Sequence, residues 1–121
     1  MRELKGHGVA LITPFKGNGA IDFEAIPRII EHLINGGVDY LVVLGTTAES
    51  TSLSKDEKKQ LIATIVNHNA GILPLVIGIG GNNTPKVIEE IISMDMSPFS
   101  AILSVTPYYN KPNQEGLYRH F

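Results

Sequence analysis

The sequence predicts an α/β fold built from consecutive βα units around a parallel sheet, and three observations support this prediction. Short apolar runs alternate along the 121 residues with segments whose apolar side chains have helical spacing, which is typical of βα units. The apolar runs are continuous, as expected for strands that are buried on both faces. The helical segments begin at capping residues, which mark where each helix should start.

The first βα unit starts with a strand that we expect at residues 9–13, where a proline ends it. The helix that follows should begin near Asp22, a favourable N-cap residue, and end at glycines 36–37. Pro27 lies too deep in such a helix, so we expect a bend or a later start there. The apolar residues of this segment have helical spacing: Ile26, Ile29, Ile30, Leu33 and Ile34.

The second unit has a strand at residues 40–44 and a helix that opens with the pattern of a capping box at residues 54–57. The third unit has a strand at residues 75–79, and its helix starts at Thr84 with Pro85 in the first helical position. The side chains of these two helices that we expect to face inward are Leu61, Ile62, Ile65 and Val66, then Val87, Ile88, Ile91 and Ile92.

A fourth strand is expected at residues 101–105, and Asn113 should cap a fourth helix, of which the chain contains the start. Two architectures fit four parallel strands, three helices and the start of a fourth. One is the N-terminal half of a (β/α)8 barrel, with residues 1–121 as its first four βα units; a complete barrel has roughly 250 residues. The other is a small doubly wound sheet of flavodoxin type. Periodicity alone does not separate them.

The composition excludes several classes of site. Without cysteine, the chain has no disulfide, thiolate nucleophile or zinc–cysteine site, which fits a cytoplasmic protein. The net charge of −2 gives no basic surface for nucleic acid, and no apolar run approaches the roughly 20 residues of a membrane span. The four histidines are scattered, so we expect no metal site. We likewise expect no cofactor and no nucleic-acid or membrane partner.

Both architectures bind ligands beyond the carboxyl ends of their strands, so the loops there are the candidate sites. Residues 45–50 carry two neighbouring hydroxyls, Thr46 and Thr47, which can hold a small carboxylate with the help of backbone amides; a merely polar loop fits equally well. Residues 78–84 lack the third glycine of a dinucleotide fingerprint, so a tight turn is the better interpretation. The paired tyrosines in residues 106–112 either transfer protons or fill space, and composition favours the second.

A likeness to a known family runs along the whole chain and is carried by four motifs. They are Val-Ala-Leu-Ile-Thr-Pro-Phe at residues 9–15, Gly-Thr-Thr-Ala-Glu at 45–49, Val-Thr-Pro-Tyr-Tyr-Asn-Lys-Pro at 105–112 and Gln-Glu-Gly-Leu-Tyr at 114–118. The chain resembles the dihydrodipicolinate synthase family, the pyruvate-dependent Schiff-base lyases of lysine and diaminopimelate biosynthesis. The resemblance implies a (β/α)8 barrel and a cytoplasmic homotetramer. It also implies that a lysine condenses with pyruvate and that the resulting enamine attacks aspartate semialdehyde, giving 4-hydroxy-tetrahydrodipicolinate.

The resemblance also implies roles for residues of this chain. Thr46 would join a proton relay between two tyrosines. One of these would be Tyr109, reaching across a dimer interface into the neighbouring subunit. Thr47 would hold the pyruvate carboxylate, and Gly45 belongs to the same substrate-binding loop. Ala48 stands where the family usually has glycine. Alanine is less permissive of positive φ, so we expect either an ordinary backbone or a slight, tolerated strain there.

The lysines of the chain do not meet the needs of Schiff-base chemistry. Such a lysine must be neutral and is usually desolvated at a strand end. All those present fall in predicted loops or on predicted helix surfaces: Lys5, Lys16, Lys55, Lys58, Lys59, Lys86 and Lys111. We therefore expect the Schiff-base lysine to lie outside residues 1–121 and the isolated chain to be inactive.

The family also suggests an allosteric site. In members that lysine inhibits, the inhibitor lies at a subunit interface near the positions that match Ser50, Lys55, Lys58, Asn82, Lys86 and Tyr108. A carboxylate normally matches Lys86 and binds the ammonium group of the inhibitor. A lysine there would repel a cationic ligand, so we expect the parent enzyme to be insensitive to lysine.

Other functions stay open beside the synthase. One is the half barrel of another pyruvate aldolase, such as a sialate lyase, although the paired threonines and the Tyr-Tyr-Asn segment favour the synthase. Another is a non-catalytic half-barrel module. Half a barrel leaves two unpaired edge strands and an exposed inner face, so we expect the isolated chain to self-associate. A flavodoxin-like receiver would need clustered aspartates at its strand ends, which the chain lacks.

Overall fold

The computed structural model of the protein describes residues 4–121. Its centre is a four-stranded parallel sheet whose strands lie in chain order, β1-β2-β3-β4. The strands are β1 (Gly8–Ala10), β2 (Tyr40–Val43), β3 (Leu75–Gly78) and β4 (Ala101–Leu103). A flavodoxin-type sheet reverses its strand order at a switch point, and this sheet does not. The strand order therefore favours the barrel architecture over the doubly wound one.

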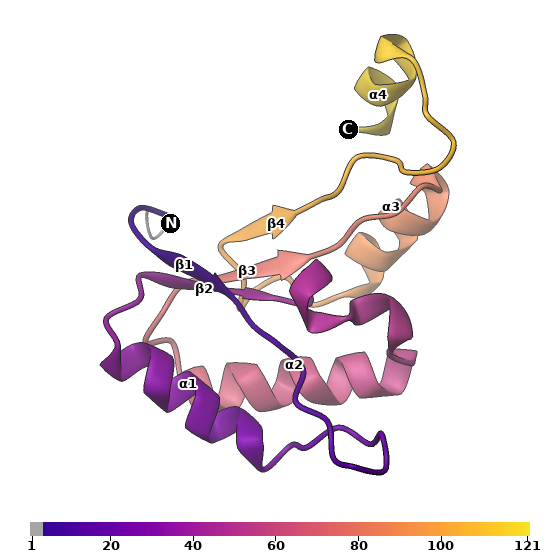
Figure 1. Ribbon diagram of the computed structural model, residues 1–121. Helices are drawn as coiled ribbons and strands as arrows, with labels where there is room; N and C mark the ends of the chain where they lie inside the picture. Colours follow the sequence, from indigo (N-terminus) through magenta and orange to yellow (C-terminus); the bar gives the residue numbers. More distant parts are fainter. Residues whose placement is uncertain (1–3) are drawn as a thin grey trace.

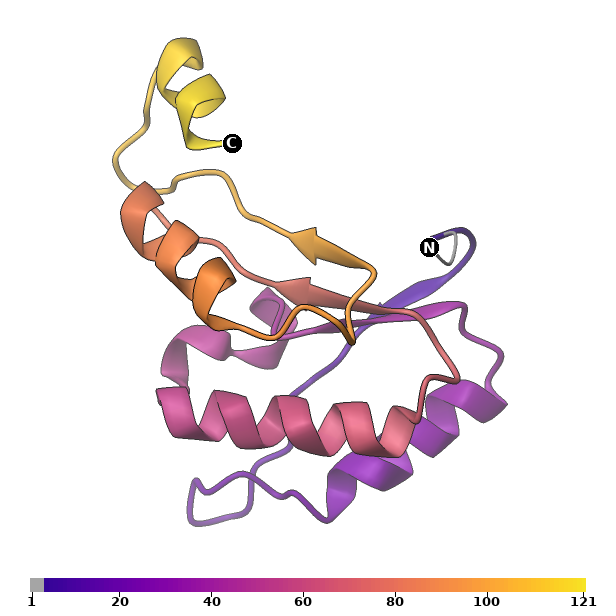
Figure 2. The same ribbon diagram turned by 180° about the vertical axis from the view of Figure 1, so that it is seen from behind.

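The helices follow the strands one by one. They are α1 (Ala25–Asn35), α2 (Lys55–Asn69), α3 (Thr84–Ser93) and α4 (Gln114–His120). Right-handed crossovers between neighbouring strands place successive helices on one face of a sheet, and α1 and α2 lie there side by side (Figures 1 and 2). The short α4 stands beyond the carboxyl end of β4 instead of packing on the sheet (Figure 1). In residues 4–121, no helix has the length and apolarity to cross a membrane.

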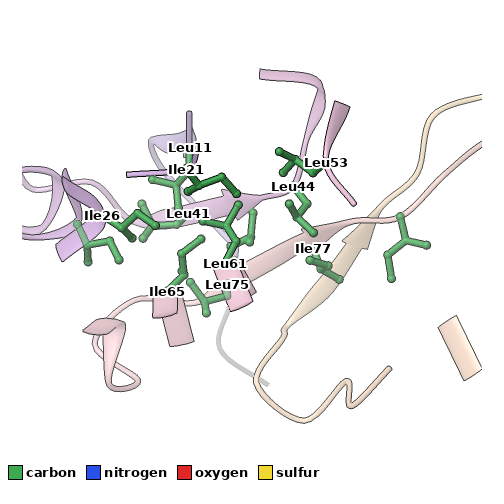
Figure 3. Close-up of a cluster of buried hydrophobic side chains, with 13 residues drawn as sticks. Leu11, Ile21, Ile26, Leu41, Leu44, Leu53, Leu61, Ile65, Leu75 and Ile77 are labelled. Carbon is green, nitrogen blue, oxygen red and sulfur yellow. The ribbon is translucent and has the colours of Figure 1, made fainter. Parts of the chain in front are cut away.

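The hydrophobic core fills the space between α1, α2 and the covered face of the sheet (Figure 3). Leu41 pairs with Leu75 and Val43 with Ile77 across the β2–β3 ladder, so each pair shares a face. All four side chains are buried. The helices meet them with side chains that the helical spacing predicted, and each such burial contributes roughly 1.5–3 kcal/mol: Ile26 and Ile30 from α1, and Leu61 and Ile65 from α2.

Several elements are shorter than the sequence predicts. The predicted strand at residues 9–13 ends at Ala10, although the Leu11 amide still donates to the Val42 carbonyl at 2.9 Å. The other strands end one or two residues early. The β2 strand stops at Val43 because Leu44 has a φ of 55°, which is incompatible with an extended strand.

The first helix begins at Ala25, three residues later than expected. The carboxylate of Asp22 accepts a hydrogen bond from the Glu24 amide at 3.2 Å, which forms a turn before the helix. Pro27 then falls in the first helical turn, where amides have no partner within the helix. The expected later start is confirmed, and Gly37, with a φ of 75°, ends the helix as predicted.

The third helix differs from the prediction in its cap and in its exposed face. The side chain of Asn83, and not Thr84, caps it by accepting a hydrogen bond from the Lys86 amide at 3.2 Å, so Pro85 occupies the second helical position. Ile88 and Ile92 are 50% and 79% exposed, which contradicts the expectation that they face inward. The helix leads into β4, the edge strand of the described sheet, so one side of it lacks a neighbour that would cover these side chains. Val87 and Ile91 do pack against the core as predicted.

The predicted capping box of α2 is present. Ser54 Oγ accepts a hydrogen bond from the Glu57 amide at 3.3 Å, and Glu57 Oε2 accepts one from the Ser54 amide at 2.8 Å. The hydrogen bond from the Ser54 backbone, followed by that from its side chain, lowers the pKa of Glu57 below its ordinary value of 4.5. A carboxyl whose pKa is lower in the folded state stabilises that state above its unfolded pKa, and this contribution disappears as the pH falls through the folded pKa.

We predict that replacing Glu57 with glutamine makes the stability of the chain less dependent on acid pH. Glutamine can still accept the bond from the Ser54 amide but does not titrate. Urea unfolding at pH 7, 5 and 3 measures the free energy of unfolding of the unsubstituted protein and of Glu57→Gln. The difference between them should shrink as the pH falls below about 4.5, whereas Glu89→Gln on the exposed surface of α3 serves as the control. A constant difference at all three pH values would contradict the prediction.

Candidate active site at the carboxyl ends of the strands

A cleft of about 570 Å³ opens at the carboxyl ends of β2, β3 and β4. This is the edge at which the sequence places the candidate sites. The segments after the three strands supply most of its wall: Leu44, Gly45, Thr46, Ile79, Gly80, Ser104, Val105 and Tyr108, with Gly78 and Leu103 from the strand ends. Helices α2 and α3 add Lys58 and Glu90. Apolar strand ends and a few polar groups are the usual lining of a small-molecule site.

Close backbone packing shapes the floor of this cleft. The chain turns at Leu44, which is buried and has a φ of 55°. The turn passes directly over β3 at Gly78, where a Cβ atom would overlap the Leu44 carbonyl and lie 2.9 Å from the Gly45 nitrogen. Gly80 approaches the segment after β4 in the same way, because a Cβ there would lie 2.8 Å from the Val105 nitrogen. Both glycines are therefore required by contact and not by an unusual φ.

The predicted threonine pair lies on a short 3-10 turn, Thr46–Ala48. The Ala48 amide donates to the Gly45 carbonyl and the Glu49 amide to the Thr46 carbonyl, both at 3.0 Å. Thr46 and Gly45 line the cleft, whereas Thr47 is exposed outside its wall. Ala48 is buried in an ordinary backbone conformation, as one of the two expectations had it, and the left-handed residue is its neighbour Glu49, with a φ of 53°.

Only one of the two neighbouring tyrosines lines the cleft. Tyr108 lines the cleft and is 51% exposed, whereas Tyr109 lies outside the wall and is 90% exposed. Tyr109 has a φ of 68°, a conformation that costs a residue with a Cβ roughly 1–2 kcal/mol. Such strain is concentrated at functional sites in many proteins. The loop is held by Asn82, whose side chain donates to the Tyr108 carbonyl at 3.3 Å, and by Asn110, whose side chain donates to the Asn82 carbonyl at 3.3 Å.

The predicted allosteric residues fall into two groups. Ser50, Lys58 and Tyr108 line the cleft, and Asn82 contacts the Tyr108 backbone. Lys55 and Lys86 are exposed in the first turns of α2 and α3 and do not line it. The expected insensitivity to lysine stays a prediction.

Four polar residues of this region were not expected from the sequence, and one of them, Thr51, lines the cleft. Ser104 and Glu90 also line the cleft, and Thr13 donates a buried 2.7 Å hydrogen bond to the Ala48 carbonyl. A signal was present only for Thr13, which is a polar residue at the end of an apolar run. Ser104 and Glu90 lie in a strand end and a helix whose patterns predict structure alone.

None of the lysines within residues 4–121 is buried; Lys58 is partly exposed and the others are exposed. Burial is what lowers the pKa of a lysine far enough to make it a nucleophile. In the same residues, no group of three or more histidine, aspartate or glutamate side chains could hold a metal ion. The polar groups that line the cleft are hydroxyls, backbone amides, the phenol of Tyr108 and the charged side chains of Lys58 and Glu90.

Comparison with known proteins identifies relatives of the whole chain. The model of the dihydrodipicolinate synthetase family matches residues 3–121. The 4-hydroxy-tetrahydrodipicolinate synthase of Flavobacterium psychrophilum is 63% identical over 121 residues, which are 100% of this chain and 41% of that protein. The same enzyme of Parabacteroides distasonis is 50% identical over 98% of this chain and 40% of its own length.

Solved structures agree with the sequence relatives. The chloride-inhibited dihydrodipicolinate synthase from Acinetobacter baumannii, complexed with pyruvate, superposes with a TM-score of 0.91 at 37% identity, covering 98% of this chain and 40% of that one. A dihydrodipicolinate synthase from Thermotoga maritima gives 0.89 at 41% identity, covering 95% and 39%. The chain thus spans about 40% of the length of these relatives, and the predicted half of a (β/α)8 barrel is confirmed. The chain belongs to the dihydrodipicolinate synthetase family.

Proposed function

We propose that this chain supplies the first four βα units of a lyase that condenses pyruvate with aspartate semialdehyde to 4-hydroxy-tetrahydrodipicolinate. The observation that carries the proposal is the family match over residues 3–121, together with a cleft at the strand ends lined by Gly45 and Thr46. The pyruvate complex of the A. baumannii relative supports the first substrate. The second substrate, a cytoplasmic location and a homotetramer are carried over from the family resemblance.

In this proposal each residue of the candidate site has a distinct role. Thr46 lines the cleft, and its hydroxyl relays a proton between two phenols. A hydroxyl can do this because it serves as both donor and acceptor of hydrogen bonds. Gly45, which lines the cleft, and Thr47, which is exposed next to the lining residue Thr46, hold the carboxylate of the keto acid. Tyr109 acts in the site of a neighbouring subunit, which fits its 90% exposure and its place outside the cleft of its own chain. The lysine that forms the Schiff base comes from outside residues 1–121.

The proposal is tested in a chimera in which residues 1–121 replace the matching segment of the F. psychrophilum relative. The chimera should condense pyruvate with aspartate semialdehyde. Borohydride should trap a pyruvate adduct on it but not on the 121-residue chain alone. A soluble, folded chimera that lacks the condensation would contradict the proposed function, and cleavage of sialate instead would favour another pyruvate aldolase. A trapped adduct on the isolated chain would show that one of its own lysines reacts.

Produced by itself, the 121-residue chain is expected to self-associate. Strands β1 and β4 each have a neighbour on one side only within the described sheet. Large apolar side chains are exposed beside β4, and such surfaces drive association: Ile88, Ile92, Leu103 and Val105. Light scattering at several protein concentrations measures the mass. A stable monomer at all of them would contradict the prediction and weaken the case for a self-associating module.

A further inference from the structure

Two polar side chains are buried in residues 4–121, Thr13 at 4% exposure and Asn69 at 2%. The hydrogen bonds of Asn69 are local. Its side chain donates to the Leu73 carbonyl at 2.8 Å and accepts from the Leu73 amide at 3.1 Å, which holds the turn between α2 and β3. The bond of Thr13 is not local, because its hydroxyl reaches Ala48, 35 residues further along the chain.

Both flanking structure and side-chain chemistry fix the hydroxyl of Thr13 in place. Ala10 pairs with Val42, and the Leu11 amide still bonds the Val42 carbonyl at 2.9 Å. Beyond this pairing, Pro14 restricts the residue before it to an extended backbone. Threonine is also β-branched, so its side chain has few rotamers to choose from. The 2.7 Å distance to the Ala48 carbonyl is that of a well-formed hydrogen bond.

The turn that receives this bond is weakly held by its own contacts. Thr46–Ala48 is a single 3-10 turn of three residues, and such turns are not stable alone. Its own amide bonds end on the carbonyls of Gly45 and Thr46, which leaves the Ala48 carbonyl to Thr13. The chain leaves the turn through Glu49 in a left-handed conformation, which adds strain. Loss of the Thr13 hydroxyl would leave the carbonyl of a buried residue unsatisfied.

We propose that Thr13 is a positioning residue of the active site, because its buried hydroxyl fixes the turn that presents Thr46 and Thr47 to the keto acid. The proposal rests on the proposed function of the chain. Thr13 does not line the cleft, so it acts through the turn and not on the substrate. In other enzymes a displacement of the reacting groups by about 1 Å lowers the reaction rate about 100-fold. Loss of the single hydroxyl that holds the turn can therefore lower the rate strongly.

The test replaces Thr13 with valine, which keeps the shape and removes the hydroxyl, in the chimera described above. Thr13→Val should raise KM for pyruvate about tenfold and lower kcat about tenfold, a part of the effect of a 1 Å displacement. For Thr13→Ser, which keeps the hydroxyl, both KM for pyruvate and kcat should stay within about threefold of the values of the unsubstituted chimera. Thr64→Val is the matched control, because the Thr64 hydroxyl also donates to a carbonyl, that of Gln60 at 2.8 Å, but within α2 and outside the wall of the cleft. Thr64→Val should change neither kcat nor KM.

A second measurement does not depend on activity. The amides of Ala48 and Glu49, which close the turn, should exchange with deuterium at least about tenfold faster in Thr13→Val than in the parent chimera. The positioning role would be overturned if Thr13→Val left KM unchanged and lowered kcat only in proportion to the fraction of protein that is folded. Unchanged amide exchange would overturn it as well. If the unsubstituted chimera has no activity, the proposed function fails, and the exchange experiment alone then decides whether Thr13 fixes the turn.

Discussion

In the chimera, Thr46→Val is expected to lower kcat for the condensation by a factor of about 10² to 10⁴, the range for loss of a group that moves a proton. Valine matches threonine in shape, so the cleft should keep its form and KM for pyruvate should change far less than kcat. Thr51, which lines the same cleft, provides the control: Thr51→Val should retain activity. Equal losses for the two substitutions would mean that the effect comes from the shape or polarity of the cleft and not from a relay through Thr46.

The same substitution locates Tyr109. If Tyr109 acts in the site of a neighbouring subunit, a mixed dimer of a Thr46→Val chain and a Tyr109→Phe chain has both substitutions in the same one of its two sites. One of its two sites then combines an intact Thr46 with an intact Tyr109. Co-expression of the two inactive variants should restore about a quarter of the parent activity, since half of randomly formed dimers are mixed and half of their sites are intact. If Tyr109 serves its own subunit, every site lacks one group and no activity returns. Tyr118→Phe, at another exposed tyrosine, is the control.

The parts of the fold that the sequence predicts are those decided by local patterns. The capping box at Ser54 and Glu57 needs only residues three apart, and the structure contains it. The core side chains of α1 and α2 follow from helical spacing. The spacing also predicted that Ile88 and Ile92 face inward. A pattern of apolar residues indicates a stripe on α3, but it does not say whether the chain supplies a neighbour to cover it, and here both are exposed.

The parts of the candidate site that the sequence could not predict depend on residues distant in the chain. Motifs located Thr46 and Tyr108 at strand ends, and both line the cleft. The bond from Thr13 spans 35 residues, and no local pattern indicates its partner. The left-handed φ of Leu44 is equally invisible, because leucine normally avoids this conformation. It accompanies the crossing of the chain over β3, where the Leu44 carbonyl lies close to Gly78.

That crossing makes Gly78 the position at which we expect the largest loss of stability. The Cβ of Gly78→Ala would overlap the Leu44 carbonyl and press against the Gly45 nitrogen. These are backbone atoms, which cannot rotate away as a flexible side chain can. Leu44 is buried, so relief requires β2 and β3 to separate at their ends. Overpacking of this kind costs about 1–3 kcal/mol and more where the backbone must shift.

Urea unfolding of the chimera measures this loss, and Gly17→Ala is the matched control. Gly17 has no atom within 4 Å of the position that its Cβ would take, so alanine there should be neutral or stabilise by up to about 1 kcal/mol. The two variants add the same methyl group, and the contrast between them isolates the contact with the Leu44 turn. Because Thr46 follows that turn directly, Gly78→Ala should also lower kcat at temperatures where the protein remains folded. Equal unfolding midpoints for the two alanine variants would show that the turn does not cross β3 as closely as the structure has it, and the geometry of the cleft would then have to be revised.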